Sequence, residues 1–145
     1  MGRVDDLRRG PAARLSAAGA ALLTVAAGLG VRAVLSGDVA KYAGDALYTV
    51  LVYALVVLVA PGVRPVRAAL GAAGVSWAVE LFQATGLPDA WGRHSGLVHL
   101  VLGSTFHPPD LFWYLVGAAG AALPHRALLR RTRRSCGTAV SGAAD

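Results

Sequence analysis

The chain has 145 residues, of which 55% are hydrophobic and 15% are charged, and its formal net charge is +6. A soluble domain usually carries about 25% charged residues, so this composition argues against a water-soluble globular protein. The basic residues flank apolar blocks, without interleaved aromatics or zinc-finger spacing, which argues against nucleic acid as a partner.

The first apolar block supports a retained membrane helix. Residues 1–14 are polar and basic, and the charge-free run 15–31 follows them. A cleaved signal peptide is the main alternative, but its apolar region is usually about 7–15 residues long. This run has 17 residues, and its apolar character continues to Leu35. The sequence therefore favours a helix that stays in the membrane.

Two further apolar runs predict the second and third membrane spans. Polar residues at 36–45 predict a loop after the first span. The second run covers residues 46–63, is charge-free and ends at Pro61-Gly62, and the third run covers residues 68–87. A bilayer needs about 20 apolar residues for a helical span, so both runs are long enough. The short 64–67 turn between them predicts antiparallel neighbours.

The fourth span is interrupted. Residues 97–102 form an apolar piece too short to cross, and they predict an interfacial or re-entrant segment. A helix then starts near Asp110 and reaches Leu123, which is about 21 Å and short of a bilayer. Continuation past Pro124 to residue 130 is therefore required. Small and polar residues at 135–145 predict that the tail, residues 131–145, is disordered.

The predicted fold class is all-α: a polytopic membrane protein with four transmembrane helices in one membrane domain, residues 15–130. With four spans, 11 of the 14 Lys and Arg lie on the side that holds both termini and the 64–67 turn. The positive-inside rule then places the N-terminus, 1–14, and the tail, 131–145, in the cytoplasm. The expected location is the bacterial cytoplasmic membrane.

Glu80 is the strongest indication of a functional site. It lies in the third run, which holds no other charge, and Ser76, Glu80 and Gln83 share one helical face. An ionised carboxylate at the centre of a membrane helix costs roughly 2.5–3.5 kcal/mol, so it needs a partner or a function. Structural pairing with Arg93 and the binding of a ligand or proton both stay open.

The topology gathers further polar residues at the outer end of the bundle. Asp45 and Asp110 are expected at helix N-termini, where a capping role is the alternative to a site role. The candidate ligand-binding residues are Asp45, Tyr48, Glu80, Gln83, Arg93, Asp110 and Tyr114. No catalytic residue is assigned.

Metal and cofactor sites are not expected. Cys136 is the only cysteine, which excludes an intramolecular disulfide and a cysteine-based metal site. His94, His99 and His107 are spaced by five and eight residues, and these spacings match no standard metal-ligand pair. His125 adjoins the basic tail, so it is expected to contact lipid headgroups.

The same residues carry a family resemblance. The motifs are Gly44-Asp45-Ala46-Leu47-Tyr48, Glu80-Leu81-Phe82-Gln83, Arg93, Leu102-Gly103-Ser104-Thr105-Phe106 and Asp110-Leu111 with Tyr114 and Gly117. In this order they resemble a small bacterial membrane family of unknown function, over residues 15–123. Lys41 fits the basic residue usual in that family, whereas His107-Pro108 replaces its acidic-aromatic pair. The Glu-x-x-Gln pair with a later Arg and Asp is more distantly similar to VanZ-like envelope proteins.

The expected function is the binding of a polar or anionic envelope molecule, such as a lipid-linked precursor or a lipid headgroup, in an outward-facing pocket. An intramembrane enzyme with Glu80 as acid or base is an alternative, although no nucleophile–base pair accompanies it. A non-catalytic membrane subunit is another, because Gly71-x-x-Gly74 and Gly117-x-x-Gly120 suit helix contacts. Membrane lipids are expected partners, and a protein partner or a homodimer stays open.

Overall fold

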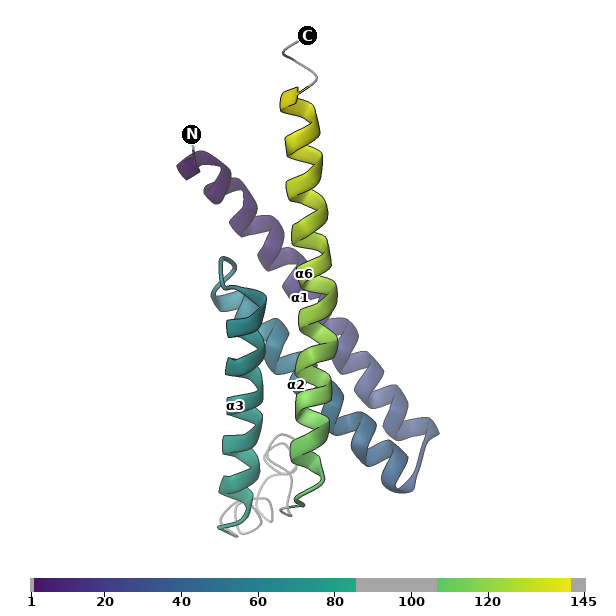
Figure 1. The fold of residues 1–145 in the computed structure, drawn as a ribbon. Coiled ribbons are helices and arrows are strands. Elements are labelled where there is room, and N and C mark those ends of the chain that lie inside the picture. The colour runs from purple at the N-terminus through teal and green to yellow at the C-terminus, as the bar shows by residue number, and fades with distance from the viewer. Residues whose placement is uncertain (1, 86–106, 142–145) are drawn as a thin grey trace.

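The computed structural model describes residues 2–85 and 107–141, and within them the side chains of residues 10–85 and 107–131. In this part of the chain the regular structure is entirely helical (Figure 1). The helices are α1 (Gly2–Val34), α2 (Gly37–Val59), α3 (Pro65–Gln83) and α6 (Asp110–Ser141). The predicted interfacial segment, residues 97–102, lies outside the described residues.

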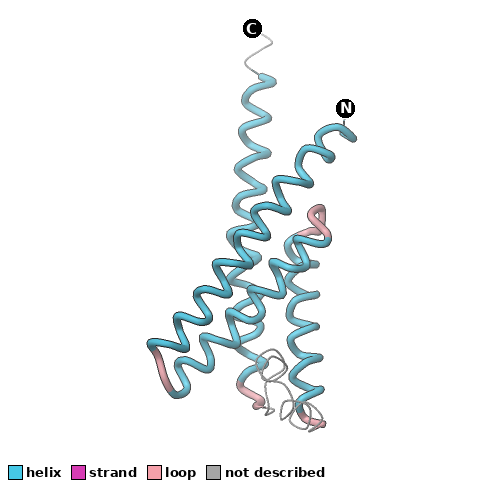
Figure 2. The backbone as a smooth tube through the Cα atoms, turned by 180° about the vertical axis from the view of Figure 1, so that it is seen from behind, coloured by secondary structure: helices cyan, strands magenta, loops and turns pink. Residues whose placement is uncertain are grey.

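Helices α1 and α2 form an antiparallel hairpin joined at residues 35–36 (Figure 2). Gly37 has a φ of +66°, a left-handed conformation that glycine adopts without steric cost. The chain can therefore reverse at this point and begin α2 at once. The second helix starts nine residues before position 46, where the charge-free run begins.

The early start of α2 corrects the expected role of Asp45. This residue lies in the interior of α2 and cannot cap its N-terminus. Alanine and lysine in residues 38–45 are good helix formers, and Lys41 forms an ion pair with Asp45 one turn later. Local propensity and this pairing keep the polar segment helical, although its polarity suggested a loop.

Helix α6 also extends further than the sequence suggested. It runs without a break through Pro124 to Ser141, so residues 131–141 are helical where a disordered tail was predicted. Arginine and alanine are strong helix formers, and no proline follows Pro124. The helix propensity of these residues therefore extends α6 beyond its apolar residues.

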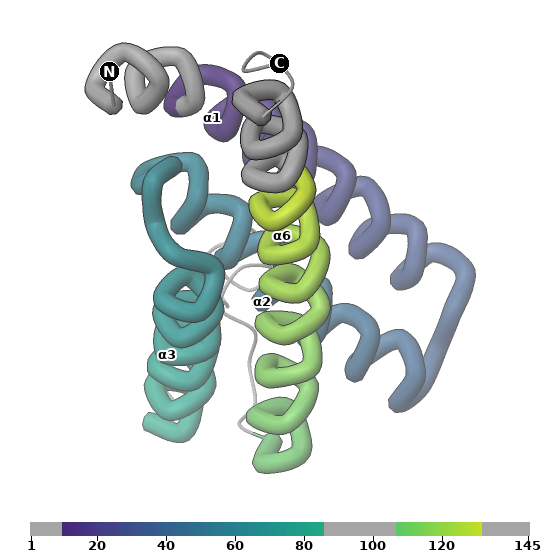
Figure 3. The backbone as a smooth tube through the Cα atoms, turned by 45° about the horizontal axis from the view of Figure 1, so that its top comes forward, coloured from purple at the N-terminus to yellow at the C-terminus, as the bar shows by residue number. Residues whose placement is uncertain are grey.

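The helices pack in two pairs. Helices α3 and α6 lie side by side, and the α1–α2 hairpin crosses them at an angle (Figures 1 and 3). Helix α2 contacts α1, α3 and α6, whereas α1 packs mainly on α2. The start of α1, the α2–α3 turn and the end of α6 lie toward one end of the bundle. The α1–α2 turn, the end of α3 and the start of α6 lie toward the other.

The two ends differ in charge. Toward the first, which we call the basic end, lie Arg14, Arg64, Arg67, Arg126, Arg130 and Arg131. Toward the other, which we call the acidic end, lie Asp38, Asp45, Glu80 and Asp110, together with Arg32 and Lys41. The carboxylates with described side chains are therefore gathered at one end of the bundle.

The side chains that are buried and those that are exposed are of the opposite kinds to those in a soluble protein. The largest fully buried side chains are Glu80, Thr49 and Ser76, and most of the buried apolar residues are alanines. Large aliphatic side chains such as Leu15, Leu70 and Val59 are exposed instead. Soluble proteins bury such side chains and keep carboxylates outside. Two helical segments, Gly10–Val34 and Gly37–Val59, are long and apolar enough to cross a bilayer, which fits an association with a membrane.

Gly117 marks the closest approach of α6 to α2. A Cβ atom added at Gly117 would lie 2.2 Å from the backbone oxygen of Ala46 and 2.9 Å from its carbonyl carbon. By contrast, a Cβ added at Gly71, Gly74 or Gly120 would meet nothing within 4 Å. Of the small-residue positions expected at helix contacts, Gly117 is the one that the described residues need for close packing.

We therefore expect Gly117→Ala to destabilise the protein by about 1–3 kcal/mol, because the added methyl group forces the two backbones apart. Thermal unfolding of the detergent-solubilised protein measures the effect. Gly120→Ala is the matched control on the same helix, and it should be neutral or stabilising by up to about 1 kcal/mol. Equal midpoints for the two variants would contradict the close contact.

Candidate functional site

Glu80 is fully buried near the end of α3, and both of its carboxylate oxygens accept hydrogen bonds. The backbone N–H of His107 donates to Oε1 at 2.6 Å, and the Tyr114 hydroxyl donates to Oε2 at 2.8 Å. Both donors belong to the segment that begins α6. A buried carboxylate is tolerated only when it is hydrogen-bonded, so these two donors offset its desolvation.

Asp110 and Tyr114 are one helical turn apart, on one face of α6. Asp110 is buried, and it binds a cation and an imidazole at once. Lys41 donates to Asp110 Oδ2, and His107 Nδ1 lies 3.1 Å from Asp110 Oδ1. The first turn of α6 is therefore tied to α2 through Lys41 and to α3 through Tyr114.

Lys41 and His107 form the accessible edge of this cluster. Their side chains are 38% and 43% exposed, whereas those of Glu80 and Asp110 are buried. A molecule approaching the acidic end could thus reach the ammonium and the imidazole but not the two buried carboxylates. Glu80 and Asp110 are accordingly suited to hold the site in shape.

Asp45 contributes an unsatisfied acceptor. Its Oδ2 atom is buried and receives no hydrogen bond from the residues that the structure describes. The nearest cation, Lys41 Nζ, lies 3.6 Å away, which is ion-pair distance but too long for a hydrogen bond. An unsatisfied buried polar group costs about 1–3 kcal/mol, so a hydrogen-bond donor that reached Asp45 would be stabilising.

A buried pair of hydroxyl groups extends this cluster into the interface between α2 and α3. The hydroxyls of Thr49 on α2 and Ser76 on α3 are fully buried and lie 3.0 Å apart. Thr49 is one turn from Asp45, and Ser76 is one turn from Glu80. Polar side chains from two helices therefore follow one line between α2 and α3.

The structure brings five of the predicted site residues together at the acidic end: Asp45, Tyr48, Glu80, Asp110 and Tyr114. Tyr48 joins them through its ring, whose centroid lies 6.3 Å from that of Tyr114. Gln83 lies in the last turn of α3, one turn beyond Glu80. Arg93 lies outside the described residues, so the expected Arg93–Glu80 pair does too.

Lys41 and His107 were absent from the predicted site. A signal for Lys41 existed, because it stands four residues before Asp45 and so shares its helical face. The expectation of a loop before residue 46 hid that relation. His107 makes two contacts of different kinds, one from its backbone and one from its ring, and only the ring contact with Asp110 follows a helical spacing.

His125 also differs from expectation. It was predicted to contact headgroups, but its Nδ1 lies 2.7 Å from the hydroxyl of Tyr53 in α2. The two rings meet edge-on, with centroids 5.9 Å apart. His125 thus links α6 to α2 within the bundle, because the longer α6 keeps this residue on a packed helical face.

The charge of the cluster limits what it can bind. The described part holds three carboxylates, Asp45, Glu80 and Asp110, against one ammonium, Lys41. Among these residues no group of three His, Cys, Asp or Glu side chains is arranged to hold a metal ion. The arrangement favours a ligand that donates hydrogen bonds, and an anionic group could bind only beside Lys41 and His107.

The Tyr114 hydroxyl is expected to stabilise the fold through Glu80. Tyr114→Phe removes one of two donors to a buried carboxylate, which should lower the unfolding free energy by about 1–3 kcal/mol. Tyr48→Phe is the matched control, since no hydrogen bond of the Tyr48 hydroxyl is seen within the described residues. Thermal unfolding in detergent compares the two variants.

A double variant separates this bond from general loss of packing. When Glu80→Gln is already present, Tyr114→Phe should cost clearly less than it does alone, because the carboxylate that needs the donor is gone. Additive losses from the two substitutions would show that the hydroxyl and the carboxylate act independently.

Comparison with known proteins gives a family match that covers this part of the chain. A family model described as a protein of unknown function (DUF2809) matches residues 34–118. This range contains α2, α3 and the first turns of α6, and therefore every residue of the cluster. No curated protein and no solved structure gives a significant match. The chain belongs to the DUF2809 family, whose function is unknown.

Proposed function

We propose that the chain is a four-helix integral membrane protein of the bacterial cytoplasmic membrane, with both termini in the cytoplasm. The exposed leucine and valine side chains on all four helices support this arrangement, because lipid tails would cover them. Helix α3 has 19 residues, which is about 28 Å and close to the thickness of the hydrocarbon core. The membrane domain would comprise residues 15–130.

The charge difference between the two ends supports the orientation. Basic residues near membrane helices are retained on the cytoplasmic side, and the described arginines gather mainly at the basic end. The acidic end, with Glu80 and Asp110, would then face outward. The site would lie at the level of the outer leaflet.

Cysteine labelling tests this orientation. In a Cys136→Ser background, we expect Ser36→Cys in the α1–α2 turn to react with a membrane-impermeant maleimide on intact cells. Gly62→Cys in the α2–α3 turn is the matched control and should react only after the membrane is permeabilised. Labelling of position 62 in intact cells, without labelling of position 36, would reverse the orientation.

The proposed function is the binding of a polar envelope molecule, such as a lipid-linked precursor or a lipid headgroup, at the acidic end. The observation that carries it is Asp45, whose side chain is 21% exposed and whose Oδ2 receives no hydrogen bond from the described residues, beside the accessible Lys41 and His107. This set offers one acceptor for a hydroxyl or amine and two nitrogen groups for an anion. A phosphate-bearing headgroup that also carries hydrogen-bond donors matches both.

The other residues would have supporting roles in this proposal. Glu80 and Asp110 hold the 107–114 segment against α2 and α3, and the Tyr48 ring borders Tyr114. Arg93 would add the second full positive charge that a phosphate needs, and Gln83 would orient polar groups. The distant resemblance to VanZ-like envelope proteins supports a ligand from the cell envelope.

The geometry makes Glu80 a poor candidate for an intramembrane acid or base. A catalytic group must exchange a proton with the substrate, within hydrogen-bond reach. Both oxygens of Glu80 already accept hydrogen bonds from the protein, and the residue has no exposed surface. The contacts therefore favour a positioning role for Glu80 and a binding role for the site.

Mass spectrometry of lipids that co-purify with the protein tests the proposed function. Asp45→Asn keeps the size of the side chain but replaces a charged acceptor, and a hydrogen bond to a charged group is worth about 1.5–3 kcal/mol. We expect retention of the envelope ligand to fall about tenfold or more. Asp38→Asn is the matched control, since Asp38 lies on the same helix and outside the cluster.

The pattern of losses decides the outcome. A ligand lost in Asp45→Asn and kept in Asp38→Asn supports the site. Identical lipid profiles for the wild type and both variants would overturn it, provided that the variants unfold at the same temperature as the wild type.

A further inference from the structure

A furrow runs along the outside of α3 and α6 and ends at the basic end. It has a volume of about 310 Å³, and it lies between Val66–Ala73 on one side and Leu115–Arg126 on the other. Ala69, Ala73, Ala118 and Ala122 contribute small side chains, and Leu70 and Leu123 are larger and exposed. Apart from Arg126, its lining is apolar.

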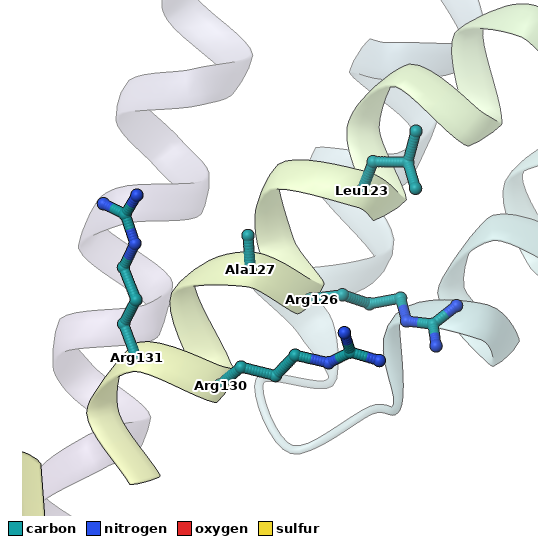
Figure 4. Close-up of a pocket in the computed structure, with 5 residues that line it drawn as sticks. All are labelled: Leu123, Arg126, Ala127, Arg130 and Arg131. Atoms are coloured by element: carbon teal, nitrogen blue, oxygen red, sulfur yellow. The ribbon is translucent and has the colours of Figure 1, made fainter. Parts of the chain in front are cut away.

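A second, basic hollow adjoins the furrow. This hollow has a volume of about 480 Å³ and is lined by Leu123, Arg126, Ala127, Arg130 and Arg131 (Figure 4). Leu123 and Arg126 line both spaces, so the basic hollow adjoins the end of the apolar furrow. Each volume falls in or near the range of ligand sites, about 300–1,000 Å³.

The arginines of the hollow are arranged for an anion. Arg126 and Arg130 are one helical turn apart and extend to the same side of α6, whereas Arg131 points away from them (Figure 4). Both Arg126 and Arg130 also line a smaller hollow with Pro65, at the start of α3. Within the described residues, no carboxylate forms an ion pair with either of them.

Like charges at this spacing repel each other and weaken a helix. An anion between the two guanidinium groups would remove that repulsion, and guanidinium groups bind phosphate oxygens in pairs. The chemistry required is thus a phosphate attached to an apolar chain. Of the molecules at a membrane surface, an anionic phospholipid has this chemistry.

We propose that Arg126 and Arg130 bind the phosphate of an anionic phospholipid of the inner leaflet, and that one of its acyl chains lies in the furrow between α3 and α6. The site is distinct from the acidic end: it shares no residue with the Glu80 cluster and lies at the opposite end of the bundle. Charge complementarity selects the headgroup, and the small side chains of the furrow accommodate the acyl chain.

Native mass spectrometry of the full chain tests the proposal after reconstitution into nanodiscs of mixed phosphatidylglycerol and phosphatidylcholine. A direct guanidinium–phosphate hydrogen bond contributes about tenfold or more to binding, so the double variant Arg126→Gln, Arg130→Gln should lower the retained phosphatidylglycerol by about a hundredfold. Arg14→Gln removes a charge from the basic end outside the hollow, and it should lower retention by no more than the roughly fivefold of general surface attraction.

A second variant tests the furrow without changing charge. Ala119 is exposed and lines the furrow, so Ala119→Leu should fill it without disturbing the packed side of α6. We expect retention of phosphatidylglycerol to fall by about fivefold or more, with both arginines intact. Gly120→Ala, on the same helix and outside the furrow lining, should leave retention unchanged.

Three results would overturn the proposal. The first is an equal loss per charge in Arg14→Gln and in the arginine double variant, which would mean general attraction to an anionic surface. The second is unchanged retention in Ala119→Leu, which would remove the acyl chain from the furrow. The third is displacement of the lipid by inorganic phosphate alone, which would mean that the acyl chain of the lipid contributes nothing to binding.

Discussion

The structure depends on a buried carboxylate that receives two hydrogen bonds from one neighbouring segment. Glu80 ends the packed part of α3, and the donors from His107 and Tyr114 come from the beginning of α6. Without these donors a charge in this position would carry a desolvation cost of several kcal/mol. The same contacts fix the first turn of α6, and that turn presents Asp110 to Lys41. The shape of the acidic end therefore follows from the requirement to satisfy one charge.

The helices also pack closely because the residues buried between them are small. Alanines and one critical glycine let the backbones approach, and at Gly117 there is no room for a methyl group. In the proposed membrane arrangement, lipid would give the helices no hydrophobic reason to associate, so van der Waals contact and buried hydrogen bonds would have to hold them. The Thr49–Ser76 bond and the Tyr53–His125 bond supply two such links between α2 and its neighbours. Small interior residues and polar links thus support each other.

Sequence patterns located the acidic end, but they could not give its bonding. A lone charge in an apolar run pointed to Glu80, and basic residues beside the runs separated the two ends. The start of α2 was missed because local polarity resembled a loop, while Gly37 and helix propensity extended the helix by nine residues. Partners such as Lys41 and Asp110 are 69 residues apart, and no local pattern encodes that contact. Propensity and hydropathy describe single segments, whereas the site is made between segments.

Helix α6 connects the two chemically different ends of the molecule. Its first turns carry Asp110 and Tyr114, which bind groups of α2 and α3, and its later turns carry Arg126 and Arg130. Helix α2 contacts it along the way, at Gly117 and at His125. Because Gly117 leaves no free space against Ala46, α6 is held against α2 between its two ends. One helix therefore fixes the polar cluster at the acidic end and presents the arginines at the basic end.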